Sequence, residues 1–243
     1  MSILRDISGV LLDVASVVMP RTCIVCGRVL MESESCMCIA CRYNMPLTNF
    51  SKERNNPITR LFENVIPIES ATALFWFVGN SEWQRIIHNF KYYNRWFFAQ
   101  KMGEWFGEEL RDSENFGNIE LIVPIPLHFR RRLMRGYNQS EQLALGMGRK
   151  MGVRCEFRAV RRRSYNDSQT SKSKSERWDN VDDIFEVRDV EKLRGQHILL
   201  VDDVMTTGAT MSSCATAIIR ACEGDVRISV ASLAASRRMA DGW

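Results

Sequence analysis

Two almost wholly apolar runs constrain the fold of this chain more than any other feature. LIVPIP begins at residue 121 and HILLV at residue 197, and such runs are expected of central strands covered on both faces. Strand-like segments (71–78, 120–125, 153–160, 197–201, 227–233) alternate with helix-like segments (82–93, 95–111, 139–151, 210–222). The alternation predicts an α/β fold, a parallel sheet flanked by helices, with ligands beyond the carboxyl ends of its strands.

The composition is that of a folded protein with a substantial core. The 243 residues are 45% hydrophobic and 26% charged, which disfavours disordered, collagenous and small disulfide-rich classes. Apolar residues recur at helical spacing between residues 3 and 18, interrupted by Asp6 and Asp13, and no cleavage site follows. We therefore expect an amphipathic N-terminal helix that docks on the rest of the protein, no membrane span, and a cytoplasmic location.

Five of the eight cysteines lie between residues 23 and 41. Two Cys-x-x-Cys pairs, with eleven residues between them, have the spacing of a structural four-thiolate Zn²⁺ site formed by Cys23, Cys26, Cys38 and Cys41. Cys36 could replace Cys38, although its spacing is less regular, and a disulfide cluster is the alternative that a reducing cytoplasm disfavours. We expect a small zinc ribbon and the preceding helix in residues 1–60, and the α/β domain in 61–243.

The remaining cysteines, Cys155, Cys214 and Cys222, are scattered, and we expect them to be small buried apolar residues. Charge is unevenly distributed as well. Residues 128–178 carry 14 basic and 4 acidic side chains in a chain whose net charge is only +4. This bias indicates an anionic ligand, such as phosphate or nucleic acid, or a solvated basic face. Within this stretch, 165–178 is rich in Ser and Lys and predicts a mobile loop or a plain surface linker.

The segment 198–210, ILLVDDVMTTGAT, is the most specific in the chain. A buried strand ends in Asp202 and Asp203, and a helix begins close to Thr210 after a short turn. Free N–H groups and hydroxyls at such a helix start make a cradle for a phosphate dianion, here formed by Thr206, Thr207, Gly208, Ala209 and Thr210. The two carboxylates could accept hydrogen bonds from the hydroxyls of a ribose. The segment is neither a Walker loop nor a GxGxxG motif, and it suits a ribose 5-phosphate.

This segment closely resembles the phosphoribosyl pyrophosphate (PRPP) motif of type I phosphoribosyltransferases. With the cysteine pairs ahead of it, the chain resembles the ComF family of phosphoribosyltransferase-like proteins, which is associated with competence and DNA uptake or use. The supporting segments are FKYYNRW at 90–96, VPIPLHFRRRLMRGYNQSEQLA at 123–144, and Gln169, Arg177 and Asn180 before Phe185. The resemblance extends from the cysteine pairs to Leu233.

The resemblance implies roles for further residues. It implies a type I phosphoribosyltransferase-like fold in which the segment after residue 125 lies near the pyrophosphate of PRPP. Arg135 and Lys91 are the cations that we expect to bind it, because guanidinium groups bind two oxygens at once. The reaction implied is displacement of pyrophosphate at the anomeric carbon, with Mg²⁺ neutralising the leaving group and Asp202 and Asp203 holding the ribose. The other arginines of the segment are Arg130, Arg131 and Arg132, which could equally form a solvated or nucleic-acid-facing patch.

Several alternatives stay open at the level of the sequence. Asn138 and Gln139 could cap the following helix rather than bind a ligand. The chain could be a transferase with an unknown acceptor, or a non-catalytic DNA-processing factor that binds single-stranded DNA or a competence helicase. The aromatic residues that could stack on bases are Trp83, Trp96 and Tyr137. In a third hypothesis the zinc module itself reads nucleic acid through its few arginines, Arg21, Arg28 and Arg42.

Overall fold

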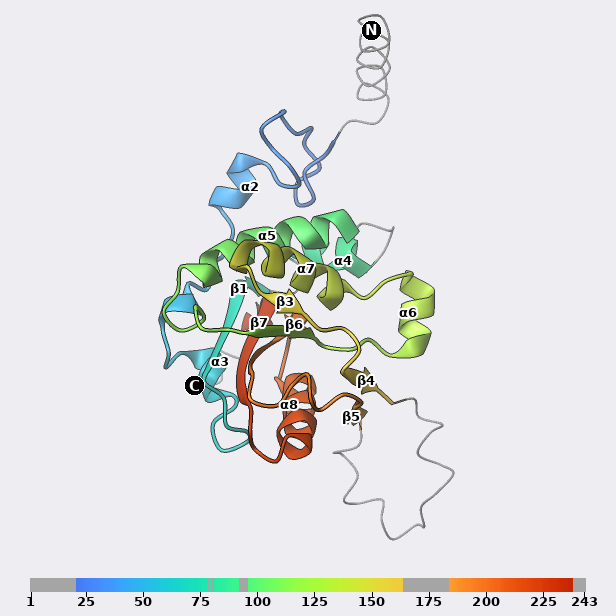
Figure 1. Ribbon diagram of the computed structural model, residues 1–243. Helices are drawn as coiled ribbons and strands as arrows, with labels where there is room; N and C mark the ends of the chain where they lie inside the picture. The colour runs from blue at the N-terminus through green and yellow to red at the C-terminus, as the bar shows by residue number, and fades with distance from the viewer. Residues whose placement is uncertain (1–20, 78, 80, 92–95, 164–183, 238–243) are drawn as a thin grey trace, which may run out of the picture.

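The computed structural model describes residues 21–77, 79, 81–91, 96–163 and 184–237 (Figure 1). The predicted N-terminal amphipathic helix and the predicted loop at 165–178 lie outside the described residues. In the part of the chain that the structure describes, no helix is long and apolar enough to cross a membrane.

A five-stranded parallel sheet forms the centre of the molecule (Figure 1). Its order across the sheet is β1 (Ser70–Phe77), β7 (Arg227–Ser236), β6 (His197–Met205), β2 (Leu121–Pro124) and β3 (Arg154–Cys155). β6 pairs with β7 from His197↔Arg227 to Met205↔Ala235 and with β2 from Leu121↔Ile198 to Pro124↔Val201. The two apolar runs therefore lie side by side in the middle of the sheet, and the predicted parallel α/β fold is confirmed.

Both faces of the sheet are covered, which explains why its central strands are apolar throughout. Leu199 and Val201 of β6 belong to one hydrophobic cluster, whereas Ile198 and Leu200 belong to the other. The first cluster includes residues of α4 (Gln84–Lys91), α5 (Trp96–Arg111) and α7 (Gln139–Met151). The second includes residues of α3 (Pro57–Arg60) and α8 (Ala209–Ala221). Figure 1 shows these two helical layers on opposite sides of the sheet.

The predicted strand 153–160 is the main point at which the structure differs from the expected elements. It is divided into β3, at the edge of the main sheet, and β4 (Val160–Arg162), which pairs with β5 (Phe185–Val187) in a separate antiparallel sheet. The carboxylate of Glu156 accepts hydrogen bonds from the N–H groups of Arg158 and Ala159, at 2.8 and 3.1 Å. These side-chain bonds satisfy the backbone in a turn and so interrupt the strand.

Three short helices were not expected from the sequence: α2 (Ile39–Tyr43), α3 and α6 (Phe129–Arg135). α6 projects from one edge of the molecule and buries none of its residues. Its ends are fixed locally, because the ring of His128 accepts a hydrogen bond from the N–H of Arg130, and Gly136 closes the helix with a left-handed conformation (φ 77°). Caps of this kind stabilise a short helix whose apolar residues are all exposed.

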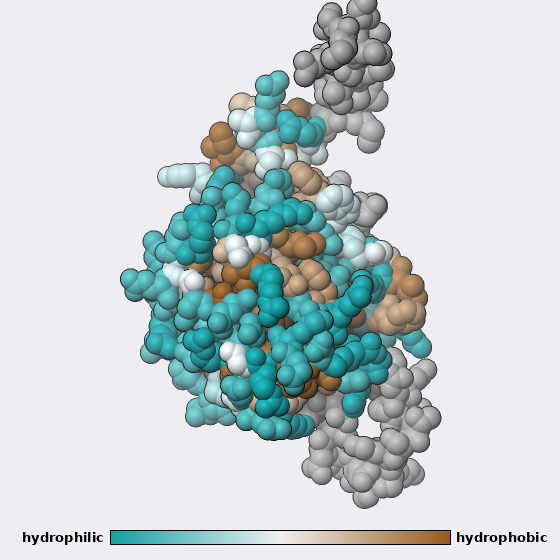
Figure 2. Space-filling view, viewed as in Figure 1, coloured by the Kyte–Doolittle hydropathy of each residue, from teal (hydrophilic) through white to brown (hydrophobic). Residues whose placement is uncertain are grey.

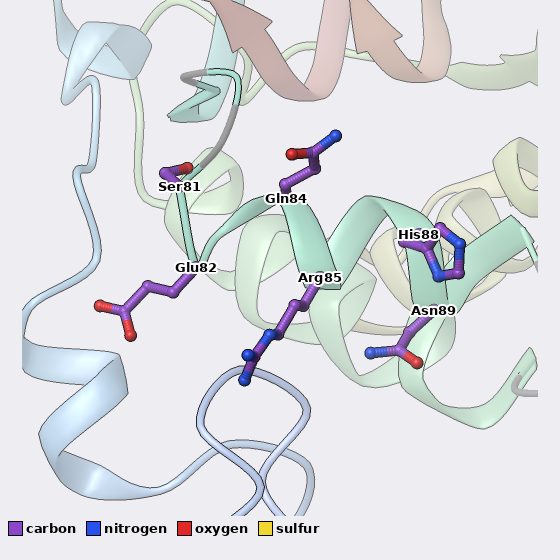
Figure 3. Close-up of a pocket in the computed structure, with 6 residues that line it drawn as sticks. All are labelled: Ser81, Glu82, Gln84, Arg85, His88 and Asn89. Carbon is purple, nitrogen blue, oxygen red and sulfur yellow. The ribbon is translucent and has the colours of Figure 1, made fainter.

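The cysteine-rich segment packs against the α/β core instead of standing apart from it. Its buried cysteines belong to the same hydrophobic cluster as Leu74, Trp83 and Ile86. Figure 3 shows Arg85 pointing from α4 toward a loop of this segment, where its guanidinium donates to the carbonyl of Val25 at 3.0 Å. The segment after it continues onto the sheet, since an isolated bridge joins residue 47 to residue 75 of β1.

Candidate functional site

The residues predicted to form a phosphate cradle lie where β6 turns into α8. Gly208 is the N-cap of α8, with φ 75°, and no side chain caps it; the Thr207 hydroxyl accepts only a long bond, 3.4 Å, from the N–H of Ala209. The first N–H groups of a helix have no partner within the helix, so they are available to an anion. A small hollow of about 30 Å³ opens here, and the residues that line it are Asp202, Val204, Met205, Thr206, Thr207, Gly208, Ala209, Thr210 and Met211.

Gly208 is held in place from behind by Phe62, a fully buried residue. A Cβ at position 208 would lie 3.2 Å from the Phe62 ring, in a backbone conformation that other residues rarely adopt. Glycine at this position therefore allows both the left-handed backbone of the turn and the close contact with Phe62.

The paired acids lie within β6 and not after its end, because the strand continues to Met205. Asp202 Oδ1 accepts hydrogen bonds from the Ser140 hydroxyl at 2.8 Å and from the N–H of Asp203 at 2.9 Å. Burial, together with the negative charge of Asp203, raises the pKa of Asp202 to about 7. The structure thus places Asp202 at the wall of the predicted cradle, whereas Asp203, the next residue of β6, does not line it.

The RGYNQS segment connects three elements at this end of the sheet. Tyr137 and Gln139 both donate to the carbonyl of Phe90 at the end of α4, at 2.6 and 3.1 Å. Asn138 donates to the carbonyl of Ile125 at 3.0 Å, and its own oxygen accepts the N–H of Ser140. Asn138 is therefore the N-cap of α7, as one of the alternatives expected, and the segment positions its neighbours through buried hydrogen bonds.

The two cations expected at the pyrophosphate differ in how far the structure describes them. Arg135, the last residue of α6, is partly exposed and donates to the Gln139 side chain at 3.2 Å. Lys91 ends α4 next to Phe90, and thus close to the RGYNQS segment, but its side chain lies outside what the structure describes.

Two residues near this site were missed from the sequence. The sequence analysis did not select Ser140. Its hydroxyl lies in the first turn of the predicted helix 139–151, and the start of a helix that follows a strand is expected near the carboxyl ends of the strands. Arg162 belongs to a run of three arginines, and only the pairing of β4 with β5 distinguishes it from the other two.

The four predicted cysteines, and not Cys36, form a cluster. The Sγ atoms of Cys23, Cys26, Cys38 and Cys41 all lie within 4.8 Å of one another. The Cys26 and Cys38 sulfurs are 3.8 Å apart, which is the edge of a tetrahedron with metal–sulfur bonds of about 2.3 Å. Burial disfavours the Cys38 thiolate, but hydrogen bonds from Cys41 and neighbouring groups outweigh it and lower the pKa of Cys38 to about 7. Four thiols in this geometry fit a closed structural metal site.

The other cysteines behave largely as expected. Cys214 and Cys222 are fully buried, whereas Cys155 is half-buried and donates to the carbonyl of Ala144 at 3.2 Å. Cys36 is buried too, and burial raises the pKa of its thiol.

The arginines of the cysteine-rich segment are exposed, and each of them contacts another group of the protein. Arg28 forms an ion pair with Glu34 at 2.7 Å, and Arg21 donates to the carbonyl of Met31 at 3.3 Å. The Arg42 guanidinium lies 4.8 Å from the centre of the Trp105 ring. Each of the three guanidinium groups thus has a partner within the protein, and nucleic-acid binding by this segment stays a prediction.

A wider, open cavity lies along α4 (Figure 3) and shares no residue with the phosphate cradle. The residues that line it are Ser81, Glu82, Gln84, Arg85, His88 and Asn89. All come from α4 and the turn before it, and Arg85 and Asn89 already hold the cysteine-rich segment through the carbonyls of Val25 and Ile24. The cavity thus belongs to the junction between that segment and the core.

Comparison with known proteins identifies related sequences. Residues 129–241 match the phosphoribosyl transferase domain family. DNA utilization protein YhgH of Escherichia coli O6:H1 is 29% identical over 138 residues, which cover 56% of this chain and 60% of that protein. Competence protein F of Haemophilus influenzae is 27% identical over 131 residues, covering 52% of this chain and 57% of that protein. The matches thus span less than two thirds of these relatives.

Among solved structures, a glutamine phosphoribosylpyrophosphate (PRPP) amidotransferase from B. subtilis, complexed with ADP and GMP, is similar to this chain with a TM-score of 0.40. It is 16% identical, and the similarity covers 56% of this chain and 26% of that one.

Proposed function

Because this chain is a phosphoribosyltransferase-like protein of the ComF family, we propose that it binds PRPP, or another ribose 5-phosphate, at the carboxyl end of β6. The observation that carries the proposal is the juxtaposition of an uncapped α8 N-terminus with two carboxylates on one strand–turn–helix segment. The 5-phosphate would occupy the cradle formed by residues 206–210. Asp202 and Asp203 would accept hydrogen bonds from the ribose hydroxyls.

The geometry also supports transfer of the phosphoribosyl group to an acceptor. The bond between the anomeric carbon and the pyrophosphate oxygen would break, pyrophosphate would leave with the bonding electrons, and the acceptor would form the new bond to that carbon. The two carboxylates would stabilise the positive charge that develops on the ribose ring. Mg²⁺ typically binds through substrate phosphates with few protein ligands, so the site fits it, and the ion would neutralise the leaving pyrophosphate.

A titration of the full chain with PRPP in the presence of Mg²⁺ tests binding. We expect heat of binding and thermal stabilisation for the wild type, and loss of both for the double variant Asp202→Asn/Asp203→Asn. Asp112→Asn is the matched control, because Asp112 pairs with Arg111 in a different part of the molecule. A wild type without heat or stabilisation, or a double variant that binds as the wild type does, would contradict the proposal.

In the four-cysteine cluster we propose a structural Zn²⁺ ion. Tetrahedral coordination by four thiolates leaves no open position on the ion. The metal would therefore fix the fold of the segment and take no part in the transfer step.

A role in DNA uptake or use is proposed from the names of the relatives, and direct binding of single-stranded DNA is the second candidate function. Of the aromatic residues expected to stack on bases, Trp83 and Tyr137 are buried, whereas Trp96 is 44% exposed. On α6, the exposed Phe129 lies beside exposed arginines, and Figure 2 shows hydrophobic side chains over this helix. A competence helicase would be a partner in the same role.

A labelled single strand titrated across a salt series separates this second candidate from the first. Binding that weakens with salt, and weakens further in Arg130→Gln and Trp96→Ala, would support direct contact. Arg111→Gln is the control, since Arg111 is engaged with Asp112. Undetectable binding at low salt would exclude direct DNA contact and leave a protein partner.

A further inference from the structure

The cysteine-rich segment exposes large hydrophobic side chains on the side that does not pack against the core. Single exposed hydrophobic residues are normal on a protein surface, whereas a group of them marks a surface that contacts another element or molecule. Figure 2 shows hydrophobic side chains on this part of the molecule. The residues of the group, called the ribbon patch below, are Val29, Met31, Ile39 and Tyr43, whose exposed fractions are 57, 57, 65 and 88%.

The local backbone brings the members of the ribbon patch together. Leu30 is buried between Val29 and Met31, so the two exposed side chains point to the same side, as alternate residues of an extended segment do. The buried carboxylate of Glu34 joins this segment to α2, because its two oxygens accept the N–H groups of Met31 and Ile39, both at 2.8 Å. The extended segment and the start of α2 therefore lie side by side.

The last member of the patch follows along α2. Ile39 and Tyr43 are the first and last residues of this helix, four positions apart, and residues with this spacing lie on the same helix face. Cys41, which lies between them, is buried instead. The patch thus continues from the extended segment along the exposed face of α2, while the opposite face carries the cysteine cluster.

The chain enters the described structure directly beside this patch. The carbonyl of Arg21 accepts the N–H of Leu30 at 2.8 Å, and its guanidinium donates to the carbonyl of Met31 at 3.3 Å. Residues 1–20 are therefore tethered next to Met31. The residue before a proline is disfavoured in a helical conformation, so Pro20 predicts that a helix formed by residues 3–18 ends here and that the chain can change direction.

The sequence of this tethered segment supplies a hydrophobic face of the required kind. A helix of 16 residues is about 24 Å long and is marginal in water by itself, so its apolar face needs a surface to pack on. A tethered segment reaches a surface beside its own attachment point at an effective concentration in the millimolar range. The apolar residues at helical spacing are Ile3, Leu4, Ile7, Val10, Leu11, Val14 and Val18.

We propose that residues 3–18 form an amphipathic helix whose apolar face packs on the ribbon patch. The occupant of the patch is this chain's own N-terminal segment, and the small domain consists of the cysteine-rich segment with this helix over its outer face. The sequence predicts docking of the helix without saying where, and the patch supplies the surface. The inference is independent of the ligand proposed for the carboxyl end of β6.

Hydrogen exchange of the full chain, followed by mass spectrometry, tests the contact. We expect residues 3–18 to exchange at least about 10-fold more slowly than an unstructured peptide of the same sequence. The double variant Ile39→Ser/Tyr43→Ser should lose this protection, and so should Leu11→Asp, which changes only the tethered segment. Val65→Ser is the matched control, since Val65 is 61% exposed outside the ribbon patch, and it should keep the protection. Melting curves and elemental analysis show whether each variant keeps its fold and its metal content.

Photocross-linking provides a second measurement that requires no loss of stability. With p-benzoylphenylalanine in place of Tyr43, cross-links within one chain should map to residues 3–18. The same group in place of Phe157, which is exposed between β3 and β4, should give none to that segment.

Several results would overturn the inference. Exchange of residues 3–18 in the wild type as fast as in the free peptide would exclude the contact. Protection that survives Ile39→Ser/Tyr43→Ser in a folded variant would place the helix on another surface. Protection that appears only at high protein concentration, or only with phosphatidylglycerol vesicles, would identify the occupant of the apolar face as a second copy of the chain or as a membrane.

Discussion

The conformation and the packing of Gly208, at the start of α8, both restrict which residue can occupy this position. Gly208 adopts a left-handed conformation and lies against Phe62, while the residues that follow it line the cavity. A side chain at this position would add backbone strain and displace a buried ring. The same substitution would change the shape of the proposed phosphate cradle.

Gly208→Ala is therefore expected to lower the free energy of unfolding by about 1 to 2 kcal/mol and to weaken PRPP binding. Gly152→Ala is the matched control: Gly152 also has a positive φ, 71°, but a Cβ there would meet nothing within 4 Å. Urea denaturation of both variants measures the change in the free energy of unfolding, and titration with PRPP measures the change in binding. A smaller loss at Gly208 than at Gly152 would show that the contact with Phe62 has no energetic consequence.

Asp202 is the second residue whose surroundings predict a measurable property. Its pKa is raised from 3.8 to about 7 by burial and by Asp203. Between these two values the folded protein retains a proton that the unfolded chain has released, so the contribution of Asp202 to stability falls as the pH rises through this window.

Asp202→Asn is expected to raise the free energy of unfolding at pH 8 by roughly 1 to 2 kcal/mol, after allowance for the solvent that reaches the carboxyl, with little effect below pH 4. The Asn side-chain oxygen can still accept the Ser140 hydroxyl. Urea denaturation at several pH values measures this difference. Asp112→Asn should change stability in the opposite direction at pH 8, because hydrogen bonding to Arg111 lowers the pKa of Asp112; a pH-independent effect at Asp202 would contradict the assignment.

At the scale of elements, the contact between α5 and α7 explains how the site-bearing end of α7 is placed. The two helices approach closely along a line of glycines. A Cβ at Gly103 would lie 2.2 Å from the carbonyl oxygen of Leu143, and one at Gly146 would lie 2.1 Å from that of Gln100. The close approach fixes α7, and with it the Asn138 cap and the Ser140 hydroxyl that contacts Asp202.

Gly103→Ala is expected to destabilise the protein by about 2 to 4 kcal/mol because the helices must separate. In an ordinary helix interior the same change stabilises by about 1 kcal/mol, so the sign of the effect is the test. Gly79→Ala is a suitable control, since a Cβ at Gly79 would meet nothing within 4 Å. Thermal or urea unfolding measures both, and a Gly103→Ala protein more stable than the wild type would exclude the close contact.

At the scale of the whole molecule, the cysteine-rich segment and the helical layer over one sheet face share a single hydrophobic cluster. Arg85 and Asn89 of α4 hold the segment through the carbonyls of Val25 and Ile24. Loss of the proposed Zn²⁺ should therefore destabilise the α/β core as well as the cysteine-rich segment.

Cys26→Ser is expected to abolish stoichiometric zinc binding and to lower the melting temperature of the whole chain by about 5 to 10 °C in one transition. Cys36→Ser, which changes a buried thiol outside the cluster, should retain the metal. Elemental analysis and calorimetry provide the measurements. A wild type without zinc, or a separate early transition in Cys26→Ser, would contradict the metal or its coupling to the core.

Much of the fold could be predicted because the strongest signals are local. The apolar runs predicted β2 and β6, and the spacing of the cysteines selected the four whose sulfurs cluster. The division at residue 60, the cytoplasmic location and the roles of the site residues stay predictions. α6 could not be predicted because it buries nothing, and the break between β3 and β4 depends on the side-chain hydrogen bonds of Glu156.

The sequence by itself determined the parallel sheet and the strand–turn–helix segment with its two acids, because these depend on the order and periodicity of neighbouring residues. Only the tertiary structure decided which side chains meet across elements. Ser140 reaches Asp202 from another part of the chain, Phe62 packs behind Gly208, and the pairing of β4 with β5 separates Arg162 from its two neighbours. Such contacts depend on how helices and strands pack in space, which no local pattern in the sequence encodes.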